Sequence, residues 1–142
     1  MTAAKEIPTP APEPVLREDQ VDYTPTARSV SLSRHRAARL VLQWGHPLMA
    51  GDVALVVSEL ATNSVMHGAV RGRLFRVHLT LTEFVLRAAV SDPRGERLPQ
   101  LGRPGDDECF GRGLLIVAQL ADRWGVEQRD LGKTVFAELS VR

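Results

Sequence analysis

The sequence predicts an α+β fold, a two-layer sandwich in which three helices cover one face of a mixed, mostly antiparallel sheet. Apolar residues recur at helical spacing in three segments of the 142-residue chain. In other segments they alternate with polar residues, and these segments are linked as hairpins. A strand of alternating polarity has one face to bury, and amphipathic helices can cover it.

The first helix is predicted from about residue 27 to 44, before Gly45. Val30, Ala37, Val41 and Trp44 share one face at helical spacing. The other side is basic, with arginines at positions 28, 34, 36 and 39. Two readings stay open for this basic side: an ordinary solvated face, or a docking surface for a partner protein.

The second helix is predicted from about residue 50 to 67, with Gly68 as its C-terminal glycine. The third is predicted over residues 111–125, "GRGLLIVAQLADRWG". Its core-facing positions are predicted to be Leu114, Val117, Ala118 and Ala121.

Strands are predicted where the period changes to two. They span about residues 73–81, 84–92, 126–129 and 134–141. A loop of about 18 residues separates the second strand from the third helix, and unstructured loops of more than about 12–15 residues are often lids.

Composition narrows the class of protein. A formal net charge of +1 does not indicate a nucleic-acid partner, and the single cysteine fits a reducing cytoplasm. No apolar run approaches the roughly 20 residues that span a bilayer, and the N-terminus has no apolar signal region. Five of the nine prolines lie in the first 25 residues. We therefore expect a disordered tail over residues 1–25, with one edge strand near residues 21–24, and a folded domain over residues 26–142.

The stretch "SELATNSVMHG" carries the first candidate site. Glu59, Asn63 and His67 recur at every fourth position and so form one polar stripe on the second helix. Such a stripe is either a solvated face or a site where several side chains reach one ligand. Local sequence does not decide between the two.

Three later positions are ambiguous in the same way. Gly111-Arg112-Gly113 opens a helix, where free N–H groups suit a phosphate, yet it also reads as a plain joint between loop and helix. Asp92 ends a strand, where it can serve either as a turn-forming residue or as an acceptor for a ligand N–H group. The hydroxyl of Thr134 could serve a similar role from the last strand, or Thr134 is an ordinary strand residue. Neither of the common nucleotide fingerprints, GxxxxGK[ST] or GxGxxG after a parallel strand, is present.

Taken in order, "ELATN…H", "VSDPRG", "GRGL" and "GKTVFAEL" resemble the ATP-binding domain of the GHKL superfamily (Bergerat fold). Gyrase, a heat-shock chaperone, histidine kinases and mismatch-repair ATPases share that domain. The sequence is most similar to the anti-sigma-factor serine kinases and related regulatory ATP-binding proteins, which are abundant in actinobacteria. The resemblance covers about residues 26–142.

The resemblance implies ATP and Mg²⁺ as ligands. Asn63 matches the residue that holds Mg²⁺ between the ATP phosphates, and Glu59 matches the general base. Positions i and i+4 on one helix face can both reach one phosphate group. The resemblance leaves the role of His67 open.

The resemblance also assigns roles to residues of the three later motifs, which are called boxes below. Asp92 matches the carboxylate that accepts a hydrogen bond from the adenine amino group. Here the chain departs from the common pattern, because the glycine, Gly95, stands three residues after the aspartate rather than two. Gly111, Arg112, Gly113 and Leu114 match the phosphate-binding box, residues 98–110 match a lid, and Thr134 matches a threonine near the adenine.

Two functions follow from the resemblance. The first is a serine/threonine kinase that sequesters a sigma factor and phosphorylates an anti-sigma-factor antagonist. The alternative is a non-catalytic, ATP-dependent module that docks these partners. Members of the family often form dimers, so a homodimer is a further expectation. We expect a cytoplasmic protein with no direct nucleic-acid partner and no membrane partner.

Overall fold

The computed structural model describes residues 13–68, 72–92, 108–130 and 132–142. Five strands form one sheet in the order β1-β2-β3-β5-β4. Each neighbouring pair of these strands is antiparallel. The strands are β1 (Arg17–Tyr23), β2 (Phe75–Leu81), β3 (Val85–Asp92), β4 (Arg123–Gln128) and β5 (Lys133–Ser140).

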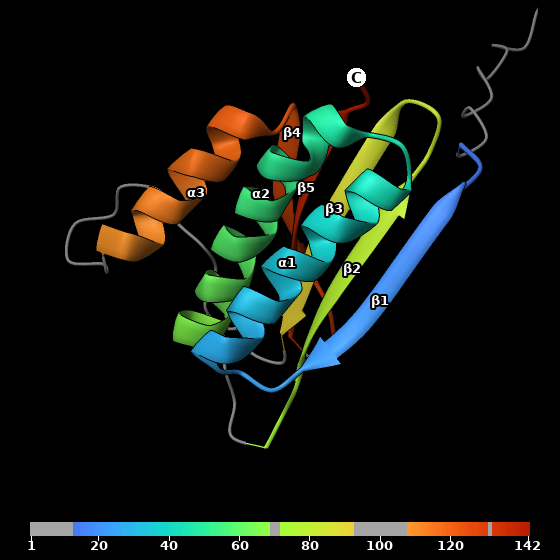
Figure 1. Cartoon of the computed structure of the whole chain (residues 1–142). Coiled ribbons are helices and arrows are strands. Elements are labelled where there is room, and N and C mark those ends of the chain that lie inside the picture. The colour runs from blue at the N-terminus through green and yellow to red at the C-terminus, as the bar shows by residue number, and fades with distance from the viewer. Residues whose placement is uncertain (1–12, 69–71, 93–107, 131) are drawn as a thin grey trace, which may run out of the picture.

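Three helices cover one face of this sheet, and α2 lies between α1 and α3 (Figure 1). The predicted two-layer α+β sandwich is therefore confirmed. The helices are α1 (Ala27–Gln43), α2 (Ala50–Asn63) and α3 (Glu108–Leu120). A 3₁₀ turn, Pro47–Met49, leads into α2, and a π-helical turn, Ser64–Gly68, follows it directly.

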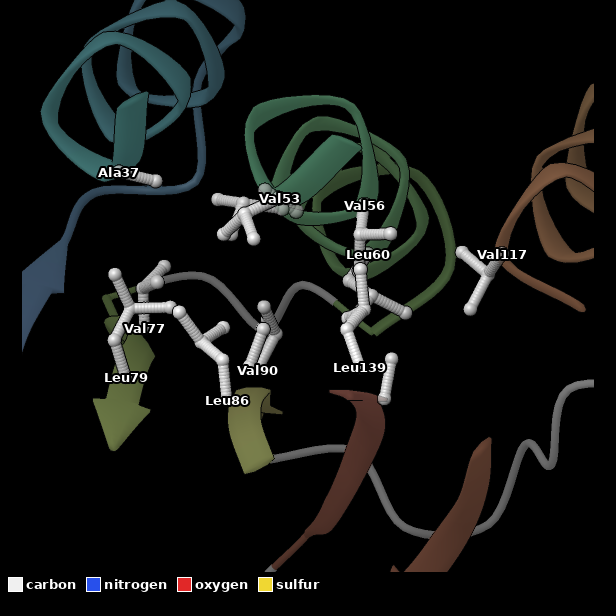
Figure 2. Packing of buried hydrophobic residues seen from close by; sticks show 14 of the residues in the cluster. Ala37, Val53, Val56, Leu60, Val77, Leu79, Leu86, Val90, Val117 and Leu139 are labelled. Carbon is white, nitrogen blue, oxygen red and sulfur yellow. The ribbon is translucent and has the colours of Figure 1, made fainter. Parts of the chain in front are cut away.

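The hydrophobic core fills the space between the two layers (Figure 2). Val53, Val56 and Leu60 of α2 point toward the sheet, and Val90 and Leu139 point back from β3 and β5. All five side chains are almost fully buried. The alternation along β2, β3 and β5 thus has one physical cause: every second residue faces the helices.

The opposite face of the sheet is lined with charged side chains. Phe136 lies there between two guanidinium groups, with Arg87 4.6 Å and Arg123 5.0 Å from its ring centroid. Both arginines are also ion-paired, Arg87 to Glu127 at 2.8 Å and Arg123 to Glu138 at 2.5 Å. Polar residues of the strands therefore cover this face in place of helices.

The stretch Pro47–His67 is the one described helical segment long and apolar enough to cross a membrane by length and composition. Half of its most apolar window is buried inside the protein. It contains α2, the central helix of the core, which accounts for its apolar character. The expectation that there is no membrane partner stays a prediction.

The N-terminal boundary of the folded part differs from the prediction. Residues 17–23 form β1, so ordered structure begins well before residue 26, and the edge strand is longer than the predicted 21–24. The strand was underestimated because it is mostly charged. It is held by backbone pairing with β2 and by ion pairs, such as Asp19 to Arg36 of α1 at 2.6 Å.

The third helix was also misplaced. It runs over Glu108–Leu120 rather than 111–125, and residues from Arg123 onward pair with β5 instead. Leu114 and Val117 are buried as predicted, whereas Ala118 is exposed. The apolar residue Trp124 belongs to β4 and packs against the core from the sheet, which is why it extended the helical pattern.

Candidate functional site

Glu59 and Gly113 bring two of the predicted boxes together. They lie on neighbouring helices, α2 and α3, which pack side by side. A Cβ atom added to Gly113 would stand 2.7 Å from Oε2 of Glu59, closer than real Cβ contacts allow. The absence of a side chain at position 113 therefore makes room for the Glu59 carboxylate.

Asn63 lies one helical turn after Glu59, at the end of α2, and its side chain is buried. Its Oδ1 atom, and Oγ of the neighbouring Ser64, have no hydrogen-bond partner among the residues that the structure describes. Buried polar atoms normally have a partner, and orphaned ones often mark a site for an ion or ligand. Amide oxygens suit Mg²⁺, so Asn63 fits the predicted magnesium ligand.

Asn63 offers one oxygen only. The described part of the chain holds no group of three or more His, Cys, Asp or Glu side chains that could bind a metal. A magnesium ion here would take its other ligands from phosphate oxygens and water, as Mg²⁺ commonly does. The arrangement therefore fits a metal that arrives with a nucleotide.

His67 belongs to the π-helical turn that follows Asn63. The α-helical spacing that placed it on one stripe with Glu59 and Asn63 does not continue through this turn. Single π-helical turns are rare in proteins, and those that occur are frequently found at functional sites. This turn contacts β3, the strand that ends at Asp92, and so links the first predicted box to the second.

Asp92 is buried, and it faces a lysine that the sequence analysis did not single out. Asp92 and Lys133 are direct partners in the register of β3 and β5. Nζ of Lys133 lies 3.2 Å from Oδ2 and 3.3 Å from Oδ1 of the carboxylate. Each side chain is only 2% exposed. The predicted base-selecting carboxylate is therefore one half of a buried ion pair.

Thr134 and Asp92, both predicted to stand near the adenine, lie on opposite faces of the sheet. Successive strand residues point to opposite faces, and Thr134 pairs in register with Ser91, not Asp92. Its hydroxyl lies 2.7 Å from the Ser91 hydroxyl. Lys133, one residue earlier, takes the position opposite Asp92. A lysine at a core-facing position of a strand was the signal that sequence reasoning overlooked.

The glycine box lies deeper in α3 than expected. Because α3 begins at Glu108, Gly111 falls in its first turn and Gly113 in its second. Gly113 is therefore beyond the four N–H groups that a helix start leaves free. The side chain of Leu114 is buried in the core, and Arg112 is exposed. Gly95 and most of the predicted lid lie outside the described residues.

A cavity of about 250 Å³ opens beside the end of β3. It is lined by Asp22, Arg73, Leu74, Arg76, Ser91, Asp92 and Arg129. Arg76 and Ser91 are direct partners on the face of the sheet that carries no helix. Three of these residues are arginines, whereas sites for small organic ligands are mostly apolar.

Burial raises the pKa of the Glu59 carboxyl above its ordinary value. The folded protein therefore binds more protons than the unfolded chain between that value and the raised one. Stability contributed by Glu59 is complete below the ordinary pKa and is lost as the pH rises through the raised pKa. A carboxyl with a raised pKa is also better suited to accept a proton near neutral pH.

Replacing Glu59 with glutamine should therefore stabilise the protein slightly at pH 7 and not at pH 4, because the glutamine does not ionise. Thermal unfolding of both proteins across this range measures the difference. Glu83→Gln, an exposed position of similar chemistry, is the matched control. A stability gain at pH 4 as large as at pH 7 would contradict the assignment of the effect to ionisation of Glu59.

The fold recurs in solved structures of other proteins, of which two are examples. One is the crystal structure of the RsbU and RsbW domains of Rv1364c from Mycobacterium tuberculosis, with a TM-score of 0.63 and 17% identity over 89% of this chain and 33% of that chain. The other is the histidine kinase domain from the blue-light activated histidine kinase of Erythrobacter litoralis EL346, with a TM-score of 0.54 and 17% identity over 79% of this chain and 61% of that chain. This chain thus spans about a third of the first protein's solved chain.

No curated protein matches the sequence. The model of the histidine kinase-like ATPase domain family matches residues 23–138, which include α1, α2 and α3 and nearly all of β2 to β5. A match over most of the chain, together with the shared fold, identifies the family. This chain belongs to the histidine kinase-like ATPase domain family.

Proposed function

We propose that this chain is an ATP-binding regulatory protein, an anti-sigma factor with serine/threonine kinase activity toward an anti-sigma-factor antagonist. One observation carries the catalytic part. The carboxylate of Glu59 occupies the space left by Gly113, and Asn63, with its buried Oδ1, lies one helical turn away. A proton acceptor and an oxygen ligand for Mg²⁺ thus stand on one side of α2. The similarity to a structure that contains an RsbW domain supports a role with protein partners.

In this proposal the chain's own residues bind and orient ATP and deprotonate the attacking hydroxyl group. Asp92 accepts a hydrogen bond from the amino group of the adenine. Backbone N–H groups in the first turn of α3, around Gly111, hold phosphate oxygens, and Arg112 adds positive charge. Magnesium, when bound at Asn63, would neutralise charge on the phosphates.

Glu59 acts on the nucleophile. Its carboxylate accepts the proton of a serine or threonine hydroxyl as the hydroxyl oxygen bonds to the γ-phosphorus, and the bond from that phosphorus to ADP breaks. A pKa raised by burial brings this base closer to neutral pH. The products are a phosphorylated antagonist and ADP.

The nucleotide site is tested first. Replacing Asp92 with alanine should weaken Mg²⁺-ATP binding by about tenfold to a hundredfold, because a hydrogen bond to a charged group contributes about 1.5–3 kcal/mol. Asp92→Asn keeps a neutral acceptor and should lose less. Titration calorimetry gives the affinities, and circular dichroism checks the fold. Asp22→Asn, an exposed ion-paired carboxylate of β1, is the control. Unchanged affinity in folded Asp92→Ala rejects the site.

Phosphoryl transfer is tested separately. Glu59→Gln should still bind ATP while transfer of labelled phosphate to a co-encoded antagonist falls by about 10²–10⁴-fold, the usual contribution of a general base. Glu83→Gln should transfer at the rate of the unchanged protein. If the unchanged protein binds ATP but transfers nothing to any such antagonist, the non-catalytic docking module is the better description.

A further inference from the structure

The buried pair of Asp92 and Lys133 calls for a role beyond holding two strands together. Removing two charges from water is costly, and apolar residues of similar size often stabilise a protein as well or better. The positions before and after the pair on the same faces are apolar, Val90 in β3 and Val135 in β5, and both are buried. A charged pair at this position is therefore not needed for packing.

The pair can bind a ligand that presents a hydrogen-bond donor beside a hydrogen-bond acceptor along one edge. A carboxylate only accepts hydrogen bonds. An ammonium carries three N–H donors, so Lys133 can bond to Asp92 and to a second acceptor at the same time. Nζ lies 3.2 Å from the carboxylate, so a group that contacts Asp92 comes within reach of Lys133 as well. The amino group of adenine is flanked by ring nitrogens that only accept.

We propose that Lys133 is a second residue that recognises the adenine base. It donates a hydrogen bond to a ring nitrogen beside the amino group, and Asp92 accepts a hydrogen bond from that amino group. The inference rests on the proposed ATP site and adds a specificity-determining residue to it. Guanine has a carbonyl where adenine has the amino group, and of the two flanking ring nitrogens N1 carries hydrogen and N7 does not. Asp92 would therefore meet an acceptor in guanine, and Lys133 would meet a donor where N1 is the nitrogen that it contacts, so the pair disfavours GTP.

The test compares ligands that lack a single ring nitrogen. The wild-type protein should bind 1-deaza-ATP or 7-deaza-ATP about tenfold to a hundredfold more weakly than ATP, the usual effect of losing a hydrogen bond to a charged group. Lys133→Met should bind ATP and that same analogue equally. If that analogue is 1-deaza-ATP, the preference of Lys133→Met for ATP over GTP should also fall by a similar factor. Titration calorimetry in the presence of Mg²⁺ measures each affinity.

Two further variants sharpen the comparison. Arg129→Met removes a cation that contacts Ser91 and Thr134 on the other face, and it should leave the analogue penalty unchanged. If Lys133→Met does not fold, the double variant Asp92→Asn with Lys133→Met takes its place in the binding test, because it removes both buried charges. The asparagine still accepts from the amino group, so the analogue penalty should disappear there too.

The outcomes separate the two proposals. If the wild-type protein does not bind ATP, both the proposed function and this inference fail. If it binds ATP but neither analogue is weaker, or if the penalty survives loss of Lys133, the nucleotide site stands and the role of Lys133 is rejected. A penalty that disappears with Lys133 and persists in Arg129→Met supports the inference.

Discussion

Replacing Lys133 with methionine should lower the free energy of unfolding by about 3–5 kcal/mol, because the change leaves the carboxylate of Asp92 buried without this counter-ion. The two side chains are each only 2% exposed, so water does little to compensate. Such a loss is a large fraction of the roughly 5–15 kcal/mol that stabilises an ordinary domain. Urea unfolding monitored by circular dichroism measures it.

The double variant of Asp92→Asn with Lys133→Met supplies the matched comparison. It removes both charges, and the neutral pair should recover most of the lost stability. A double-mutant cycle then isolates the interaction between the two residues. Additive losses in the double variant would contradict a direct pairing, and so would a single variant as stable as the wild type. An exposed pair such as Arg142 and Asp52 should show about 1 kcal/mol or less in the same cycle.

Replacing Gly113 with alanine should reduce phosphoryl transfer by about 10²-fold or more while leaving the fold intact. The new methyl group would stand 2.7 Å from Oε2 of Glu59 and must displace it. That oxygen is the far end of a flexible side chain, so the displacement costs little stability. Removing a helical glycine even favours the fold by about 0.5–1 kcal/mol. In the proposed mechanism Glu59 is the general base, and a misplaced base loses the contribution that it makes in the transition state.

Two variants test this explanation. Gly51→Ala changes a glycine of α2 that has nothing within 4 Å of its added Cβ, so it should gain similar stability and lose no activity. Combining Gly113→Ala with Glu59→Asp shortens the acid by one methylene and should restore part of the transfer. Wild-type transfer rates in Gly113→Ala would show that Glu59 does not need this space.

The sequence predicted those features that depend on one element at a time. The spacing of Glu59 and Asn63 places them on one face of any α-helix, so their proximity needed no tertiary information. The layer that each residue of β2, β3 and β5 faces followed from alternation alone. The approach of Gly113 to Glu59 depends instead on how α2 and α3 pack, which no local pattern contains.

Other differences arose at the ends of elements. The last strand was predicted to begin at Thr134, and that start excluded Lys133 from a strand whose other core-facing residues include Val135 and Ala137. Extending the alternation back by one residue would have placed a lysine on the buried face. The π-helical turn at Ser64–Gly68 has no sequence signal in this chain, because an apolar and polar mixture of this kind suits an ordinary α-helix equally well.

The register between β3 and β5 has a consequence for how ligand preference is inherited. A slip of β5 by one residue would bring Thr134 opposite Asp92 and send Lys133 to the far face. The same slip would expose Val135, Ala137 and Leu139, which are now buried, so the core forbids it. The apolar side chains of β5 contact no nucleotide in the proposed site. They nevertheless fix the register of the strand and so determine which polar group stands beside Asp92. In the proposed site, the buried face of β5 therefore fixes position 133 beside Asp92, and a change in base preference would require a substitution at one of these two positions.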